Sequence, residues 1–351
     1  MTPEDTSDRL VEHFFPAQTL LTGNAVCPLF GDCPQVTKEE VSHVLARSSR
    51  SSAPRRDSIP YGVWKKLHSL HPDILPALTG PLVCRGYQPK SLKKAEGIVL
   101  DKPGKADSDT PASYRLIVLL ETLSKIEERL VANHLSAQAR ELGLIHSNKC
   151  GSVAGVSAFN AVTSLNHEAV TAQKRRLKAS TLFLDIKGGF DNVHPPALTR
   201  YLLMKGVFPY IVAWVRSFLC GRSCRLNFQG TPRAFMDVAV GTPQGSPISP
   251  LLFVLYVAPL YHGEHTQNTF SFVDDFALTS MATSNRRNVQ ILQARFRTLS
   301  RKANRLGLSF SIPQTELIHW RTPKDRSPCC LIPVTLDSRP FQPKEEVRWL
   351  R

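Results

Sequence analysis

Apolar residues recur along this chain with two periods, one typical of helices and one typical of strands. Two long stretches, 119–135 and 289–306, repeat apolar residues every three or four positions, which predicts amphipathic helices. In the second stretch, arginine and lysine fill most of the opposite face. Weaker signals of the same kind predict shorter helices at 37–46, 63–70, 159–170, 195–204, 210–219 and 251–257.

Strand signals are concentrated around three aspartates. Residues 181–184 are all apolar except the first, which predicts a buried strand, and they run directly into Asp185. Residues 269–278 are largely apolar around Asp274 and Asp275, which predicts a hairpin with the two acids at its bend. Further strands are predicted at 95–100, 114–120, 224–228 and 233–240.

Composition indicates a globular, strongly basic protein. The 351 residues suffice for two or three compact units, and 42% hydrophobic content excludes a mostly disordered or fibrous chain. Forty-four Lys and Arg against 29 Asp and Glu give a formal net charge of +15. A polyanionic partner and a merely soluble basic surface explain this charge about equally well.

The sequence also argues against several classes of protein. The chain starts with polar and acidic residues, and its longest apolar run, 251–260, is far short of the roughly 18 residues of a membrane span. We therefore expect neither secretion nor membrane insertion. The eight cysteines contain no Cys-x-x-Cys pair, which argues against zinc fingers and thioredoxin-type chemistry and favours reduced thiols in the cytoplasm or nucleus.

The aspartates are the main candidates for chemistry. Buried acids need a cation, a donor or a proton. Three carboxylates brought together by Asp185, Asp274 and Asp275 could hold two Mg²⁺ ions about 3.5 to 4 Å apart, the spacing used in phosphoryl transfer. By itself the adjacent pair is weak evidence, because roughly one such pair is expected by chance in a chain of this size. Asp191 is an ambiguous candidate, because it could instead cap the helix predicted at 195–204 or satisfy a turn.

The order of the motifs makes the signal specific. DIKGGFDNV, GTPQGSPISPLLF and FVDDFAL follow one another, and KPGK, SYR, LSKIEERLVANHL and GLSFS occur at matching places. In these segments the chain resembles the reverse transcriptases of non-LTR retrotransposons, and it looks closest to the fungal Tad-like group. The resemblance runs from about Thr37 to Leu350, which is most of the chain.

The resemblance implies an α+β right-hand polymerase with fingers and a palm whose antiparallel sheet is backed by helices. The expected organisation is a leader (1–36), a fingers region (37–180) and a palm (181–351). The implied activity is RNA-directed DNA polymerase with two Mg²⁺ ions, for which Mn²⁺ is the alternative. The implied partners are an RNA template, a DNA primer and deoxynucleoside triphosphates.

The resemblance also assigns site residues. Asp185, Asp274 and Asp275 would be catalytic metal ligands, and Phe190 would be the aromatic gate that rejects a ribose 2′-hydroxyl; for a lone phenylalanine, core packing is the alternative. Further nucleotide-binding residues would be Gln244 and Gly245 beside the nucleotide and template, with Lys102, Lys105 and Arg115 on the triphosphate. Solvated loop charges are the alternative for these three basic residues.

The match fails at several positions. Gln314 stands where the family usually has a lysine that donates a proton to pyrophosphate, and Lys149-Cys150-Gly151 replaces the usual Gln-Phe-Gly. The sequence ends where the primer-grip segment of the family begins, so we expect neither a thumb after this segment nor an endonuclease before the leader. The alternative hypothesis is therefore a catalytically inactive, truncated relic that only binds nucleic acid.

Overall fold

The computed structural model describes residues 3–15, 33–49, 57–101, 111–152, 156–263, 268–321, 332–347 and 349. Contacts divide the chain into two compact units, each built from two separate stretches. Unit 1 comprises Met1–Leu142 and Phe190–Leu252, and unit 2 comprises Gly143–Gly189 and Phe253–Arg351. The division into a leader, a fingers region and a palm, which follow one another along the sequence, stays a prediction.

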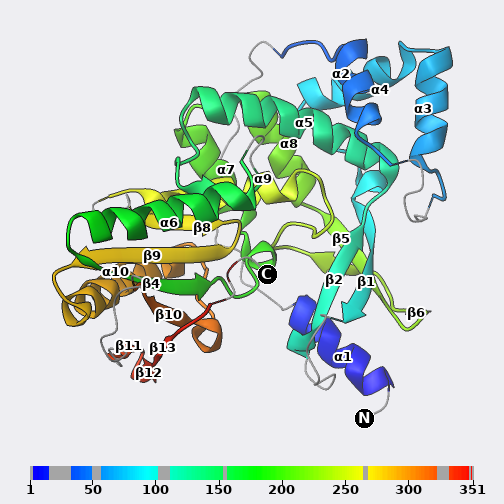
Figure 1. Ribbon diagram of the computed structural model, residues 1–351. Helices are drawn as coiled ribbons and strands as arrows, with labels where there is room; N and C mark the ends of the chain where they lie inside the picture. Colours follow the sequence, from blue (N-terminus) through cyan, green and yellow to red (C-terminus); the bar gives the residue numbers. More distant parts are fainter. Residues whose placement is uncertain are drawn as a thin grey trace. The chain divides into compact units, whose positions relative to one another are not determined.

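Unit 1 combines helices with a five-stranded sheet of order β2-β1-β5-β6, in which β7 also pairs with β5 (Figure 1). Strand β1 runs antiparallel to β2 and parallel to β5. The helices are α1 (Pro3–Phe14), α2 (Lys38–Ala46), α3 (Tyr61–Leu70), α4 (Ile74–Cys84), α5 (Thr122–Glu141), α7 (Pro195–Met204) and α8 (Pro209–Leu219), with short turns η1 (Lys90–Lys93), η2 (Pro111–Ser113) and η3 (Phe190–Asn192). The strands are β1 (Lys94–Asp101), β2 (Tyr114–Leu119), β5 (Arg222–Phe228), β6 (Thr231–Pro232) and β7 (Met236–Val238).

Local sequence explains where these helices begin. Thr37 caps α2 in a reciprocal capping box with Glu40, which satisfies two backbone donors at the helix start. The predicted long helix at 119–135 is α5, shifted toward the C-terminus. Sequence patterning missed α4, because its apolar residues surround the whole helix and Pro81 lies inside it.

Helix α1 lies within the predicted leader and packs against the rest of unit 1. Leu10 is fully buried, and Asp8 forms an ion pair with Arg233 at an N–O distance of 2.6 Å. The expectation of reduced thiols is wrong at one place, since a disulfide joins Cys33 to Cys84 with a Cα–Cα distance of 5.3 Å. No helix in the described ranges is long and apolar enough to cross a bilayer.

Unit 2 is organised around a six-stranded sheet of order β13-β10-β4-β9-β8-β3. Strands β4, β9 and β8 are antiparallel neighbours, and β10 runs antiparallel to β4 on its other side. The strands are β3 (Lys149–Cys150), β4 (Lys178–Asp185), β8 (Thr269–Phe272), β9 (Asp275–Ala282), β10 (Glu316–His319), β11 (Val334–Leu336), β12 (Arg339–Phe341) and β13 (Pro343–Lys344). The helices are α6 (Ala158–Lys174) and α10 (Asn285–Arg305), with η4 (Ala258–Tyr261) and η5 (Ile312–Gln314); α9 (Ser249–Tyr256) contains the boundary between the units.

Helices cover both faces of the β4–β9 pair, which is why β4 is buried almost throughout. On one face, Phe183 and its cross-strand partner Ala277 form a core cluster with Leu165 of α6. On the other face, the Phe276 ring lies 5.8 Å from Phe310, which in turn contacts Phe296 of α10. The predicted α+β class, with an antiparallel sheet backed by helices, is confirmed.

Candidate active site

Three aspartates lie at one end of the unit 2 sheet. Asp185 is the last residue of β4, and it is paired directly with Asp275, the first residue of β9. Directly paired residues of antiparallel strands project from the same face, so these two carboxylates are neighbours. Asp274 precedes Asp275 in the turn between β8 and β9. All three side chains are half-buried.

The turn that carries Asp274 has only two residues and an unusual backbone. Phe272 pairs with Asp275, which leaves Val273 and Asp274 as the loop of the hairpin. Val273 has a φ of 54°, a left-handed conformation that is unfavourable for a β-branched residue. Glycine normally fills such a position in a tight hairpin. Backbone strain of this kind persists only where neighbouring contacts hold it.

Strand β3 supplies those contacts. It pairs parallel with β8, and the Val273 amide donates to the Cys150 carbonyl at 3.1 Å. Gly151, with a φ of 81°, lies so close to the turn that a Cβ there would approach the Val273 Cγ2 to 2.8 Å. The Lys149 ammonium donates to the Val273 carbonyl at 2.5 Å. The turn is therefore held from one side by three successive residues.

Lys149 is a buried cation beneath the hairpin. It is 3% exposed, and its Nζ lies 5.2 Å from the ring centre of Phe276 and 5.8 Å from that of Phe253. Burial lowers the pKa of Lys149 to about 7, although the negative charge of Asp274 acts in the opposite direction. Sequence reasoning did not assign Lys149 a role; the available signal was its departure from the usual glutamine of the family.

In unit 1, Gln244 lies on the loop that follows β7. The Val118 amide of β2 donates to the Gln244 carbonyl at 2.6 Å, and the Gln244 amide group donates to Asp191 at 3.5 Å. Gly245 has a φ of 115°, and a Cβ at this position would lie 2.7 Å from the Val118 carbonyl oxygen. Glycine is therefore required where the loop crosses β2.

A buried chain of hydrogen bonds anchors the same loop to α5. The Ser246 hydroxyl donates to one carboxylate oxygen of Glu128, and Ser124 donates to the other at 2.8 Å. The Gln88 amide donates to Ser124 at 2.8 Å. Burial raises the pKa of Glu128, and the two serine hydrogen bonds oppose that shift. No sequence signal distinguished Glu128 from an ordinary charged helix residue.

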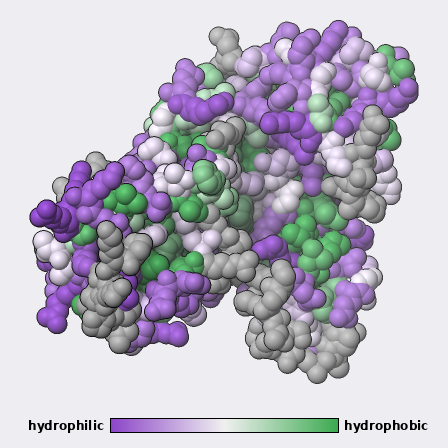
Figure 2. Space-filling view, viewed as in Figure 1, coloured by the Kyte–Doolittle hydropathy of each residue, from purple (hydrophilic) through white to green (hydrophobic). Residues whose placement is uncertain are grey.

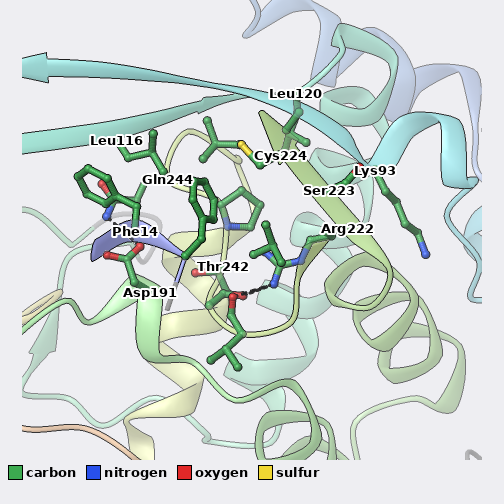
Figure 3. A pocket seen from close by; sticks show the side chains of 17 residues that line it. Phe14, Lys93, Leu116, Leu120, Asp191, Arg222, Ser223, Cys224, Thr242 and Gln244 are labelled. Atoms are coloured by element: carbon green, nitrogen blue, oxygen red, sulfur yellow. Dashed lines mark hydrogen bonds between the residues drawn. The ribbon is translucent and has the colours of Figure 1, made fainter. Parts of the chain in front are cut away.

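A pocket of roughly 530 Å³, its open mouth included, lies beside this loop within unit 1 (Figure 3). Gln244 and Asp191 contribute polar groups, and Phe14 at the end of α1 lies beside them. Arg222 lines another wall and is buried, and burial lowers its pKa to about 10. It donates to the carbonyls of Val240 and Gly241 at 3.1 and 2.7 Å. The pocket thus presents both apolar and hydrogen-bonding surface.

The other predicted site residues are placed separately. Phe190 begins η3 in unit 1, where its carbonyl accepts a hydrogen bond from the Thr242 amide at 2.7 Å, so the predicted gate is tied to the Gln244 loop. Arg115 is exposed on β2. Lys102 and Lys105 lie outside the described residues. Gln314 is exposed at the end of η5 in unit 2.

The aspartates fit a divalent cation by residue type and backbone position. Hard carboxylate oxygens are the ligands that Mg²⁺ prefers, and Asp185 and Asp275 are direct cross-strand partners. Their side chains are not arranged as an assembled cage, since no group of three His, Cys, Asp or Glu in the described ranges could hold a metal ion. The site therefore supplies the donors, but not a closed coordination sphere.

The basic helix α10 differs from its prediction at one residue. Arg295 belongs to the basic residues of the stretch 289–306, most of which were expected opposite its apolar face, yet it donates to the Thr269 hydroxyl at 2.8 Å and to the Thr279 carbonyl. Burial lowers its pKa to about 10. Arg295 therefore serves the interior of unit 2, whereas Arg297, Arg301 and Arg305 are exposed.

Comparison with known proteins places these features in a family. The model for "Reverse transcriptase (RNA-dependent DNA polymerase)" matches residues 100–350. The chain is 31% identical over 217 residues to a probable RNA-directed DNA polymerase from transposon X-element of Drosophila melanogaster, covering 62% of this chain and 24% of that protein. It is 30% identical over 229 residues to the RNA-directed DNA polymerase from mobile element jockey of the same organism, covering 64% and 24%.

Two further matches complete the comparison. A probable RNA-directed DNA polymerase from transposon BS of Drosophila melanogaster is 28% identical over 273 residues, covering 75% of this chain and 30% of that protein. This chain thus spans less than a third of the length of these relatives. Among solved structures, apo telomerase from Candida tropicalis, truncated from its C-terminal domain, aligns with a TM-score of 0.46 and 13% identity, covering 76% of this chain and 57% of that one.

Proposed function

Because the chain belongs to the reverse transcriptase (RNA-dependent DNA polymerase) family, we propose that it adds deoxynucleotides to the 3′ end of a DNA primer, in the order directed by an RNA template. The observation that carries the proposal is the direct pairing of Asp185 with Asp275, with Asp274 in the adjoining turn. This arrangement brings three carboxylates to one sheet end, in a family whose activity is nucleotidyl transfer.

Asp185, Asp274 and Asp275 would hold divalent cations, Mg²⁺ in the first place and Mn²⁺ as a substitute. When bound, two such ions activate the attacking oxygen and stabilise the leaving oxygen in phosphoryl transfer. The short turn contributes by fixing Asp274 next to Asp275, so that little side-chain freedom is lost when the ligands assemble.

Unit 1 would bind and select the nucleotide. Gln244 and Gly245 are held at β2 by backbone contacts, which suits a loop that must approach a nucleotide closely. Phe190 would exclude a 2′-hydroxyl, and its carbonyl contact with Thr242 couples it to the same loop. Arg115 would contact the triphosphate together with Lys102 and Lys105, by charge complementarity.

Gln314 affects how the leaving pyrophosphate could be protonated. A glutamine side chain cannot act as a general acid, so we propose that pyrophosphate leaves without a proton from this position. The expected consequence is a slow chemical step, by about 10²- to 10⁴-fold compared with an enzyme that has a positioned acid. Replacing Gln314 by lysine would restore that donor.

Finer assignments belong to the same proposal. We propose fingers at 37–180, palm at 181–351, membership of the Tad-like group of non-LTR elements, and a location in the cytoplasm or nucleus. A tree built from the palm motifs tests the group, and imaging of the tagged chain tests the location.

Primer extension tests the function. The wild type should extend a DNA primer on an RNA template in Mg²⁺ and stop when EDTA is added. The double variant Asp274→Asn/Asp275→Asn should lose extension, whereas the matched control Asp237→Asn/Asp337→Asn, which changes two exposed acids, should keep it. Absence of wild-type extension, with template binding retained in a gel shift, would instead support the alternative of a nucleic-acid-binding relic.

A further inference from the structure

Exposed basic residues gather at the end of the unit 2 sheet opposite the aspartates. Helix α6 ends at Lys174, β4 begins at Lys178, and α10 begins at Asn285, three residues after the end of β9. Lys178 pairs with Ala282, and the Asn288 side chain of α10 donates to the Lys178 carbonyl at 2.9 Å. The distal basic cluster consists of Lys174, Arg175, Arg176, Lys178, Arg286 and Arg287, all exposed.

The two segments that carry the cluster contain no acidic residues of their own. The sequence contains no Asp or Glu from 169 to 184 or from 276 to 315. Within the described ranges, no ion pair joins Arg175, Arg176 or Arg286 to an acid. Hydrophilic residues also cover this end of unit 2 in the space-filling view (Figure 2). Two segments about 110 residues apart therefore contribute only basic charges to this sheet end.

Arg176 occupies a position that does not suit an arginine. The Arg176 amide donates to Gln173 and the Leu177 amide donates to Ala172, which is the pattern that closes a helix with a left-handed residue. Arg176 is that residue, with a φ of 58°. Glycine is strongly favoured there, because a Cβ crowds the backbone. Helix stability therefore gives no reason for arginine at this position.

The first turn of α10 shows a second conflict of the same kind. Ser284 caps the helix, and the following turn contains Arg286 and Arg287 without any acidic residue. The partial positive charge of a helix N-terminus disfavours cations and favours acids at these positions. Two unrelated local preferences are thus violated by arginines that lie at the same sheet end. Such conflicts are expected where function rather than stability selects the residue.

We propose that the distal basic cluster is a second contact surface for the phosphodiester backbone of a nucleic-acid strand. Strand β4 has eight residues, so at about 3.3 Å per residue the cluster lies roughly 23 Å from Asp185. Arginine side chains match phosphate geometry well. Binding at this surface needs neither metal nor nucleotide, so it goes beyond the proposed polymerase activity.

Salt-dependent binding in EDTA tests the proposal. The full-length cluster variant Arg175→Gln/Arg176→Gly/Arg286→Gln/Arg287→Gln removes four charges, and the control Arg47→Gln/Lys66→Gln/Arg140→Gln/Arg200→Gln removes four exposed charges from unit 1. Fluorescein-labelled single-stranded RNA and DNA of one sequence serve as probes. The slope of log affinity against log salt should fall in magnitude by about 3 in the cluster variant, and affinity near 100 mM salt should drop tenfold or more.

The outcomes separate the alternatives. The proposal requires a loss in the cluster variant that exceeds the loss in the control, and equal losses for RNA and DNA indicate recognition of phosphate alone. A loss confined to RNA adds recognition of the 2′-hydroxyl. Equal binding by the wild type and the cluster variant, or equal losses in both variants, overturns the proposal, as does cluster-dependent binding of phosphatidylserine vesicles without RNA binding.

Thermal unfolding keeps the result interpretable. Arg176→Gly removes a left-handed arginine and should preserve or raise the melting temperature, so a lower nucleic-acid affinity in that single variant cannot come from misfolding. Because the assay contains EDTA, its result is independent of whether the aspartates support primer extension.

Discussion

Glu127 shows how strongly one buried residue can couple this fold to pH. Both of its carboxylate oxygens are buried, and neither has a hydrogen-bond partner among the residues that the structure describes. Burial raises the pKa of Glu127 to about 8, and the neighbouring Glu128 adds to this shift. The folded chain therefore keeps a proton on Glu127 at pH values where the unfolded chain has lost it.

We expect the free energy of unfolding to fall as pH rises from about 4.5 to 8, because the unfolded carboxyl ionises first and the folded one resists. At about 1.4 kcal/mol per unit of pKa difference, the effect is of the order of a few kcal/mol. Urea unfolding at pH 5.5 and 8 should show a smaller decrease in Glu127→Gln. The control Glu141→Gln changes an exposed residue of the same helix and should behave like the wild type.

Phe190 allows a second test at residue scale. If its ring excludes the 2′-hydroxyl, Phe190→Ala should lower discrimination against ribonucleotides by a factor between about 10 and 200, the usual value of one such contact. Single-nucleotide incorporation with dCTP and CTP measures the ratio. Phe159→Ala, which alters a ring that is 76% exposed on α6, should leave it unchanged. Unaltered discrimination in Phe190→Ala would exclude Phe190 as the gate.

At the scale of elements, neighbouring strands and helices hold both segments of the candidate site, the β8–β9 turn and the Gln244 loop, in place. The β8–β9 turn is held by β3, and the Gln244 loop is held by β2 and α5. In both cases a buried charged residue makes the contact, Lys149 in unit 2 and Glu128 in unit 1. We expect buried ionisable residues of this kind to contribute more to defining one geometry than to stability.

Replacing Lys149 by methionine tests that view. Methionine fills similar space without a charge, so the melting temperature should stay or rise. The Val273 carbonyl loses its donor, and we expect Mn²⁺ affinity to fall by about 10- to 100-fold, as for other residues that orient metal ligands. Calorimetry measures the affinity directly, and Lys149→Arg should recover part of it. A methionine variant with wild-type Mn²⁺ affinity would contradict the positioning role.

The Gln244 loop can be tested with two buried serines. Ser246→Ala leaves a Glu128 oxygen unpaired and should lower the free energy of unfolding by about 1–3 kcal/mol. The KM for the nucleotide should rise more than kcat falls, if the loop contacts the nucleotide as we propose. Ser249 is buried, and its hydroxyl has no hydrogen-bond partner in the described part of the chain, so Ser249→Ala should affect neither stability nor KM. The same KM in Ser246→Ala and the wild type would separate the loop from nucleotide binding.

At the scale of the whole molecule, a disulfide stabilises the fold in addition to side-chain packing. The disulfide joins Cys33 and Cys84, which are 51 residues apart. Closing a loop of this size stabilises a folded chain by about 4 kcal/mol, chiefly by restricting the unfolded chain. Cys84→Ser should therefore be less stable than the wild type without reductant and equal to it in dithiothreitol. Cys220→Ser, which removes an exposed free thiol, should show no such difference.

The sequence predicted individual helices and strands better than the pairing of strands that are distant in sequence. The alternation around Asp274 and the apolar run before Asp185 carry period and polarity within a few residues, so the acidic hairpin could be predicted. The pairing of β3 with β8 joins residues more than 120 positions apart and involves only two residues of β3. No local pattern encodes such a contact, and the roles of Lys149 and Glu128 therefore became visible only in the structure.

The order of the strands in the unit 2 sheet also affects how the chain is made. The central strand β4 leaves the ribosome about 90 residues before its partner β9, and β10 follows later still. At roughly 5–20 residues per second, β4 waits about 5–20 seconds as an apolar, unpaired segment. During that interval it is a target for chaperones and a nucleus for aggregation. Synthesis that stops between α9 and β8 would make this exposure permanent, so incomplete products of this chain should be cleared from the soluble fraction.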